Sequence, residues 1–164
     1  MTGSRVSLPH ALRILSIASV ARTLNPYAES DAQAFGLMQI VPTTAGQDVH
    51  RFLNKADGLP SREFLFNPGN NIQYGTAYLH ILHYKYLEDI EDPLSREYCV
   101  IAAYNTGAGN VLRTFDPDRD HAPQCINKLD PLQVLKILQT RLSHDEARKY
   151  LAKVMDAKKR FVNF

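Results

Sequence analysis

The longest periodic segment of the sequence lies between residues 71 and 90 and has the spacing of an α-helix. Apolar or small residues recur there every three or four positions, which places them on one helix face: Ile72, Gly75, Leu79, Leu82, Tyr86 and Ile90. No run of alternating β-branched residues with hairpin turns occurs anywhere in the sequence. The sequence therefore predicts an all-α fold built around a long, buried helix.

Shorter helices are predicted on the N-terminal side of this segment. A first helix covers residues 9 to 23 and ends before Asn25-Pro26, because a residue that precedes proline is disfavoured in helical conformation. Residues 25 to 36 have loop composition. Thr43 or Thr44 is expected to cap a helix that continues to residue 54.

Four more helices are predicted after Asp92-Pro93, which ends the long one. They cover residues 93 to 104, 110 to 115, 131 to 142 and 144 to 161. Two glycines between residues 107 and 109 allow a sharp turn after the first of them, and residues 116 to 124 form a polar loop. Ser143 and Glu146 have capping-box spacing at the start of the last helix.

The composition is that of an ordinary globular protein, with 164 residues, 45% of them hydrophobic and 22% charged. We expect residues 1 to 164 to form a single domain, since this length supports a core without metal or disulfide links. A net charge of +2 gives no indication of a nucleic-acid partner. Cys99 and Cys125 have neither CxxC nor Cys/His spacing, so we expect no metal and no cofactor. Free thiols are favoured over a disulfide, although both alternatives remain open.

The sequence has no apolar stretch long enough for a membrane span. Residues 1 to 21 resemble a secretory signal only loosely, because Pro9, His10 and Arg13 stand where its apolar centre would begin. We therefore expect residues 9 to 23 to be the first helix of a domain cut from a longer precursor.

Three short segments contain residue patterns that helix packing does not require. The first is Phe35-Gly36-Leu37-Met38-Gln39-Ile40, followed by Pro42 and Thr43-Thr44-Ala45-Gly46. The second is Asn71-Ile72 followed by Gly75-Thr76-Ala77-Tyr78-Leu79, and the third is Ala102-Ala103-Tyr104-Asn105 with Gly107, Gly109 and Val111. In this order and spacing they resemble the lysozyme-like lytic transglycosylases of bacterial cell walls. Within that family they are most similar to the membrane-bound lytic murein transglycosylase C type.

The resemblance covers residues 25 to 162 and includes Glu146, Arg148, Tyr150, Leu151 and Val154 in the last predicted helix. It implies a lysozyme-like helical fold with a substrate groove, and peptidoglycan glycan strands as the partner. It further implies a monomer in the periplasm, anchored to the outer membrane in the full-length protein. The implied reaction cleaves the β-1,4 bond between N-acetylmuramic acid and N-acetylglucosamine without water and leaves a 1,6-anhydromuramic end.

The resemblance assigns sugar-binding or orienting roles to Ser30, Gln39, Tyr104, Asn105 and Glu146. Met38 is expected to belong mainly to the core, with only its backbone or thioether edge at the sugar. Each residue also has a simpler interpretation: Gln39 as a brace of its loop, Tyr104 as a core tyrosine, and Glu146 as part of the capping box. His80 and His83, three residues apart, are interpreted as ordinary helix residues.

The family's catalytic glutamate is missing from its expected position. A single Glu acts in the family first as acid and then as base, and it needs a raised pKa and hence an apolar pocket. Where the family reads Glu-Ser-x-Phe-Asn-Pro, this chain reads Ala21-Arg22-Thr23-Leu24-Asn25-Pro26, and no acid occurs among residues 1 to 28. The departure extends over residues 13 to 24. Glu29 and Asp31 are the nearest carboxylates, and we interpret them as solvated loop charges.

Three functions remain as hypotheses at this point. The first is a lytic transglycosylase that is impaired by the loss of its acid/base at Ala21. The second is a non-catalytic module that binds glycan strands in the same groove. The third, a hydrolase similar to goose-type lysozymes, also requires the missing Glu. A helical scaffold without a site does not explain the spacing of Gln39, Tyr104 and Asn105.

Overall fold

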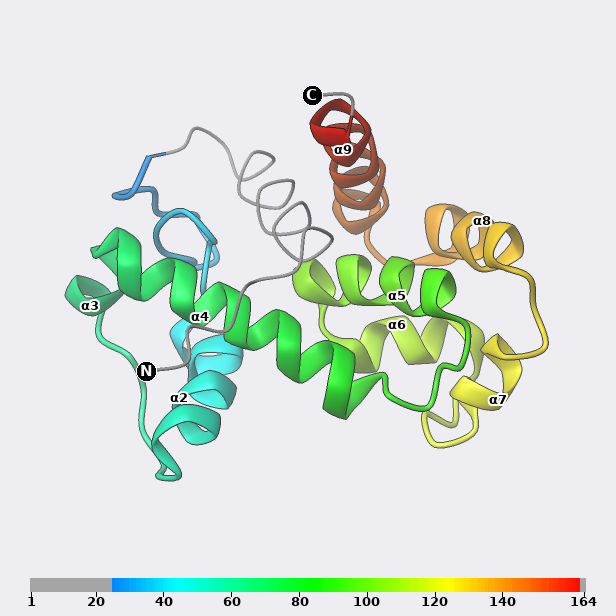
Figure 1. Cartoon of the computed structure of the whole chain (residues 1–164), viewed down its shortest axis with the longest axis horizontal. Coiled ribbons are helices and arrows are strands. Elements are labelled where there is room, and N and C mark those ends of the chain that lie inside the picture. Colours follow the sequence, from blue (N-terminus) through cyan, green and yellow to red (C-terminus); the bar gives the residue numbers. More distant parts are fainter. Residues whose placement is uncertain (1–24, 163–164) are drawn as a thin grey trace. The chain divides into compact units, whose positions relative to one another are not determined.

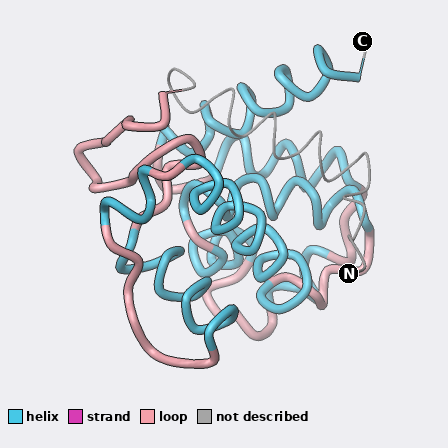
Figure 2. The backbone as a smooth tube through the Cα atoms, turned by 60° about the vertical axis from the view of Figure 1, so that its left-hand side comes forward, coloured by secondary structure: helices cyan, strands magenta, loops and turns pink. Residues whose placement is uncertain are grey.

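The computed structural model describes residues 25–162 of the chain. These residues form helices joined by loops (Figure 2). The only extended pairings in this part of the chain are two isolated bridges, between Glu29 and Phe35 and between Phe35 and Ile40. The predicted all-α fold is therefore confirmed. The predicted first helix, which includes Ala21, lies outside the described residues.

The described α-helices are labelled in Figure 1. In chain order the described helices are the π-helix η1 (Pro42–Gly46), α2 (Gln47–Asn54), α3 (Arg62–Phe66), α4 (Pro68–Ile81), the π-helix η2 (Leu82–Tyr86), α5 (Pro93–Thr106), α6 (Ala108–Phe115), α7 (Ala122–Ile126), α8 (Pro131–Arg141) and α9 (Asp145–Val162). None of these helices has the length and apolar character that a membrane span requires.

The chain divides into two compact units. One consists of Met1–Thr76 and Val154–Phe164, and the other of Ala77–Lys153. Within the first unit, α2 packs against η1; within the second, α5 packs against η2, α6 and α8, and α6 also packs against α7. Each unit has its own buried apolar side chains, among them Met38, Ile40, Val49 and Leu65 in the first and Val100, Ile101, Val111 and Leu138 in the second.

Two helices begin where the sequence predicts, and both begin with an aspartate N-cap followed by proline. The Asp92 carboxylate accepts hydrogen bonds from the Leu94 and Ser95 amides at the start of α5. Asp130 accepts from the Gln133 amide at the start of α8, and the Gln133 side chain accepts from the Asp130 amide in return. A proline follows each aspartate as the first helical residue. Capping carboxylates and proline at the first position are both favourable there, which explains why these boundaries were predictable.

The long helix differs from the prediction at its C-terminal end. Instead of continuing as an α-helix, α4 ends at Ile81 and passes into η2, where the Leu87 amide donates to the Leu82 carbonyl at 3.0 Å. This bond spans five residues, so the wider turn shifts the helical register. As a result Leu87 is buried and Tyr86 is 37% exposed.

The predicted buried face of this segment is therefore only partly correct. Gly75, Leu79, Leu82 and Ile90 are buried, whereas Tyr86 and Ile72 are exposed. Ile72 lies in the second turn of α4, where the buried neighbours are Asn71, Tyr74 and Gly75. The prediction of a threonine cap at Thr43 or Thr44 is wrong as well. Val41 occupies the cap position of η1 without a side-chain hydrogen bond, and Pro42 begins the helix.

Other boundaries differ by a few residues. α3 and α7, five residues each, were not predicted, because so short a helix carries little periodicity. α5 continues two residues beyond the predicted end, α6 begins at Ala108, and α9 begins at Asp145. The capping box of Ser143 and Glu146 stays a prediction.

We predict that Gly75→Ala destabilises the protein. An ideal Cβ at Gly75 would lie 2.7 Å from the Cβ, Cγ and Cε atoms of the fully buried Met38. Overpacking of this kind costs about 1 to 3 kcal/mol, which exceeds the gain of about 1 kcal/mol from replacing a helical glycine by alanine. Urea unfolding measures the difference. The control Gly69→Ala lies in the same helix, where the nearest atom, Asn67 Oδ1, is 3.3 Å away, and it should cost much less. Equal effects of the two substitutions would contradict the packing argument.

Candidate active site

The loop of residues 35–40 is fastened to helix α4 by one buried side chain, that of Asn71. Its Nδ2 group donates to the carbonyl oxygens of Phe35 at 2.8 Å and Leu65 at 2.9 Å, and its Oδ1 atom accepts from the Met38 amide at 2.6 Å. Asn71 is fully buried. These bonds use backbone groups of the loop and of α3, and the Phe35 carbonyl accepts in addition from the Ile40 amide. The loop and the two helices therefore depend on this single amide group.

The backbone of this loop turns back on itself between Phe35 and Ile40. The two residues exchange backbone hydrogen bonds of 3.0 Å in both directions. The turn requires left-handed conformations at Gly36 (φ 74°) and at Gln39 (φ 50°). Gly36 has no room for a side chain, because a Cβ would lie 2.6 Å from the Leu65 carbonyl oxygen. A non-glycine residue such as Gln39 adopts this conformation at an energetic cost, and such residues concentrate at functional sites.

Gln39 and Ser30 lie in the long connection of residues 25–41, which contains the loop of residues 35–40. The Nε2 group of Gln39 donates to the Gly36 carbonyl at 2.9 Å and to the Ala28 carbonyl at 3.4 Å. Both bonds come from the amide NH2 group, so the side-chain oxygen is the atom that a ligand would use as acceptor. The hydroxyl of Ser30 accepts from the Ala34 amide at 3.1 Å. Both side chains are half-buried, and both brace the loop, as the simpler interpretation of Gln39 expected.

Met38 has a fully buried side chain, which confirms that it belongs to the core. Its atoms pack against the space that Gly75 leaves open on α4. Its assignment as a substrate contact stays a prediction.

Glu29 is bound by an arginine rather than left as a free loop charge. Its Oε2 atom pairs with Nη2 of Arg62. The Arg62 guanidinium also lies over the rings of Phe35 and Phe66, at 5.8 and 5.2 Å from their centroids. Arg62 therefore connects the loop to α3 by charge and by cation–π contacts, which gives Glu29 a structural role. Asp31, in the same loop, is exposed.

In the second unit, Tyr104 lies near the C-terminal end of α5. It is half-buried, and its ring centroid is 5.5 Å from that of Tyr78. Burial of its hydroxyl group raises the pKa of Tyr104 well above the usual value, and Tyr150 and Tyr78 add to this effect. The hydroxyl therefore stays protonated and able to donate a hydrogen bond.

Asn105 and Glu146 are exposed residues of the same unit. Asn105 is followed closely by Gly107, whose φ of 87° ends α5 and whose amide donates to the Ala103 carbonyl at 2.7 Å. Glu146 lies in the first turn of α9, four residues before Tyr150. Residues at this separation share a helix face, and Tyr150 interacts electrostatically with Tyr104.

The structure thus groups the predicted site residues into two sets. Ser30, Met38 and Gln39 share the connection of residues 25–41 in the first unit, and Tyr104, Asn105 and Glu146 belong to the second. Ala21 lies outside the described residues. The expectation that both sets line one groove stays a prediction. Sequence reasoning assigned no role to Asn71, although it noted the residue in the second motif, because its partners are distant in sequence.

A family model and curated relatives both match this chain. The family model described as Transglycosylase SLT domain matches residues 11–127. Proteins named Membrane-bound lytic murein transglycosylase C are similar to this chain over 148 residues, at 50% identity in Salmonella arizonae and 51% in Histophilus somni. The matches cover 90% of this chain but only 41% and 40% of those proteins, so the chain spans about two fifths of the length of these relatives.

Solved structures share the fold. The 70 kDa soluble lytic transglycosylase SLT70 from Escherichia coli superposes with a TM-score of 0.65 at 23% identity, over 92% of this chain and 22% of that one. Lytic transglycosylase Slt from Pseudomonas aeruginosa gives a TM-score of 0.62 at 24% identity, over 94% of this chain and 22% of that one.

We predict that Asn71→Leu destabilises the protein strongly. The substitution keeps the approximate size of the side chain but removes the acceptor of the 2.6 Å bond from the Met38 amide and the donor to the Leu65 carbonyl. The Phe35 carbonyl keeps its bond from the Ile40 amide. Each unsatisfied buried group costs about 1 to 3 kcal/mol, although the costs do not simply add. Urea unfolding measures the loss, and amide hydrogen exchange at Met38 should accelerate. Asn70→Leu is the matched control, because Asn70 is only half-buried and its side chain donates one 3.2 Å bond, to the Phe64 carbonyl. A similar loss of stability in both variants would contradict the role assigned to the Asn71 side chain.

Proposed function

Because the chain belongs to the Transglycosylase SLT domain family, we propose that it acts on peptidoglycan glycan strands as a lytic transglycosylase domain. The reaction cleaves the β-1,4 bond between N-acetylmuramic acid and N-acetylglucosamine. The 6-hydroxyl oxygen of the muramic acid forms the new bond to its own anomeric carbon, so the product carries a 1,6-anhydro end. No water is consumed, and the atoms of the substrate are all retained in the two products.

The observation that carries this proposal is the loop of residues 35–40, which contains Gln39 and is held in place by Asn71. The Asn71 bonds and the two left-handed residues fix the backbone, and the loop's own carbonyls hold the NH2 group of Gln39. A preorganised amide oxygen is suited to accept a hydrogen bond from a sugar hydroxyl or acetamido group. Ser30 and Met38 belong to the same connection of residues 25–41 and support its position.

The second half of the site is proposed to consist of Tyr104, Asn105 and Glu146. The Tyr104 hydroxyl is held as a protonated donor by burial. Asn105 is exposed next to the Gly107 turn, and Glu146 is exposed on α9. In the proposed complex these residues orient sugars of the bound glycan strand.

The location and assembly are proposed from the relatives rather than from this chain. The names of the relatives describe membrane-bound proteins. We propose that the full-length protein is anchored in the outer membrane and that this domain works in the periplasm as a monomer.

Catalysis by the chain is proposed to be impaired, because Ala21 stands where the family has its acid/base. A glycan-binding module without activity is the second candidate function. It is favoured by the combination of an intact Gln39 loop with an alanine at position 21, because binding does not require the missing carboxyl group.

We predict that Tyr104→Phe and Gln39→Ala each weaken the binding of muro-oligosaccharides. Each substitution removes one hydrogen-bonding group from the site, which costs about 1 to 3 kcal/mol, or about five- to 150-fold in Kd. Isothermal titration calorimetry measures the affinity. Tyr84→Phe serves as the control, because Tyr84 is 49% exposed on η2 and has no proposed contact with sugar. The control should leave the affinity unchanged. If neither Tyr104→Phe nor Gln39→Ala changes the affinity, the assignment of these residues is wrong.

We predict that the chain releases little or no anhydro product from peptidoglycan and that Ala21→Glu restores release. A positioned general acid contributes about a hundred- to ten-thousand-fold, because the leaving oxygen departs poorly until it is protonated. Mass spectrometry identifies products one water lighter than those of a hydrolase.

Thr23→Glu is the matched control for this substitution. It adds the same carboxyl group two residues further along the predicted helix, where about 200° of helical rotation points it elsewhere. Rapid turnover by the unsubstituted chain would show that another group supplies the proton. Products with reducing ends would indicate a hydrolase, and glycan binding without any product from Ala21→Glu would favour the binding module.

A further inference from the structure

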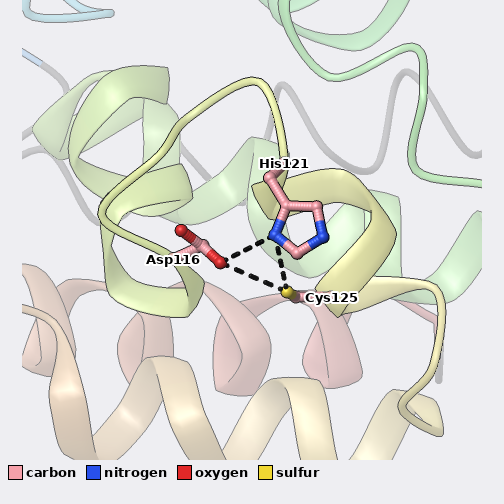
Figure 3. A group of neighbouring side chains, drawn as sticks. All are labelled: Asp116, His121 and Cys125. Carbon is pink, nitrogen blue, oxygen red and sulfur yellow. Dashed lines mark hydrogen bonds and ion pairs between the residues drawn. The ribbon is translucent and has the colours of Figure 1, made fainter.

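Three side chains of types that can bind transition metals lie close together between α6 and α7 (Figure 3). Asp116 directly follows α6, His121 directly precedes α7, and Cys125 lies within α7. The Nδ1 atom of His121 is 2.9 Å from Oδ2 of Asp116. The Sγ atom of Cys125 is 3.5 Å from the same oxygen and 3.6 Å from the same nitrogen. One oxygen, one nitrogen and one sulfur atom therefore form a small triangle.

The triangle has nearly the dimensions of one face of a tetrahedral zinc site. Zinc binds sulfur at about 2.3 Å, nitrogen at about 2.0 Å and carboxylate oxygen at about 2.1 Å, so tetrahedral ligand atoms are about 3.4 to 3.6 Å apart. The two separations that involve Cys125 already match this range. Only the separation between His121 and Asp116 must increase, by about half an ångström. The direct contact between His121 and Asp116 would then be replaced by one bond from each side chain to the metal.

The backbone holds the three ligands in position. The other carboxylate oxygen of Asp116, Oδ1, accepts from the Asp118 amide at 2.8 Å, which leaves Oδ2 directed at the partners. The Asp118 carbonyl accepts from the amides of His121 and Ala122 at 3.2 and 3.0 Å. The Cys125 amide donates to the His121 carbonyl at 3.4 Å, so these two side chains are one helical turn apart on one face. Hydrogen bonds of this kind orient metal ligands and fix their geometry.

The arrangement does not fit a catalytic cysteine. In a nucleophile–histidine–acid group the nucleophile and the acid contact different imidazole nitrogens, so that a proton can pass through the ring. Here the thiol and the carboxylate both contact Nδ1 of His121. Three ligands that converge on one point are what a metal ion requires.

We propose that Asp116, His121 and Cys125 form a Zn²⁺ site with a fourth position open to solvent. The His121 side chain is 48% exposed, which leaves room for a water molecule to complete the tetrahedron. On binding, the Cys125 thiol gives up its proton to solvent as the zinc–sulfur bond forms. The metal then links the end of α6 to α7 and fixes residues 116–125. This differs from the expectation of no metal that the spacing of the two cysteines gave. The residue pattern is His-x-x-x-Cys with an aspartate five residues earlier.

The test is a titration of the full chain, reduced and freed of metal, with Co²⁺ as a spectroscopic probe of the zinc site. A thiolate bound to Co²⁺ gives a charge-transfer band in the near ultraviolet, which should saturate at one equivalent. Zn²⁺ should then displace the Co²⁺. Cys125→Ser should abolish the band, and His121→Ala should weaken binding at least about a hundredfold, since even indirect ligand partners contribute about ten- to a hundredfold. Asp116→Asn should weaken it less, because the amide oxygen remains a ligand.

Cys99→Ala is the matched control. Cys99 is the other cysteine of the chain and is buried in α5, so the variant should keep the full band. Circular dichroism verifies that each variant is folded. Absence of the band in the unsubstituted chain overturns the proposal, whatever the variants do. It is equally overturned if the band persists in Cys125→Ser or disappears in Cys99→Ala. No glycan takes part, so the result is independent of the proposed transglycosylase function.

Discussion

The buried amide of Asn71 is the interaction on which the Gln39 loop depends. A buried primary amide is costly unless its donors and its acceptor form hydrogen bonds. The NH2 group of Asn71 donates two hydrogen bonds, and its oxygen atom accepts one. Its partners are backbone groups, so they are present whatever side chains the loop carries. The site loop therefore gains its position from α4 through a polar group rather than through apolar packing alone.

The glycines of the motifs are required for different physical reasons. Gly36 is required because the backbone has a positive φ and because a Cβ would meet the Leu65 carbonyl. Gly75 is required for a different reason, since its lack of a Cβ gives the Met38 side chain its space. Gly107 differs from both: a Cβ there would meet nothing within 4 Å, so its φ of 87° alone calls for glycine. One residue type thus serves conformation at one position, packing at another and both at a third.

The sequence could predict features that depend on neighbours in the chain. The starts of α5 and α8 were predictable because Asp-Pro is a local signal. The assignment of Gln39, Tyr104 and Asn105 to a sugar-binding site, which rests on motif spacing, stays a prediction. The π-turn at η2 was not, because apolar periodicity continues through it and only the backbone bond from Leu87 to Leu82 reveals the shift. The partners of Asn71 and the meeting of Asp116, His121 and Cys125 depend on the folded path of the backbone. The spacing of His121 and Cys125 was visible, but a search for paired cysteines overlooks it.

The contacts of Glu29 bear on whether binding and catalysis are separable. Glu29 pairs with the Arg62 guanidinium, which also lies over two phenylalanine rings. This carboxylate holds the loop that presents Gln39, so removing it would disturb the binding residues along with any chemistry. In the proposed function, glycan binding rests on the loop that contains Gln39, and proton donation rests on position 21. Loss of the carboxyl group at that position therefore does not by itself remove a residue that binds glycan.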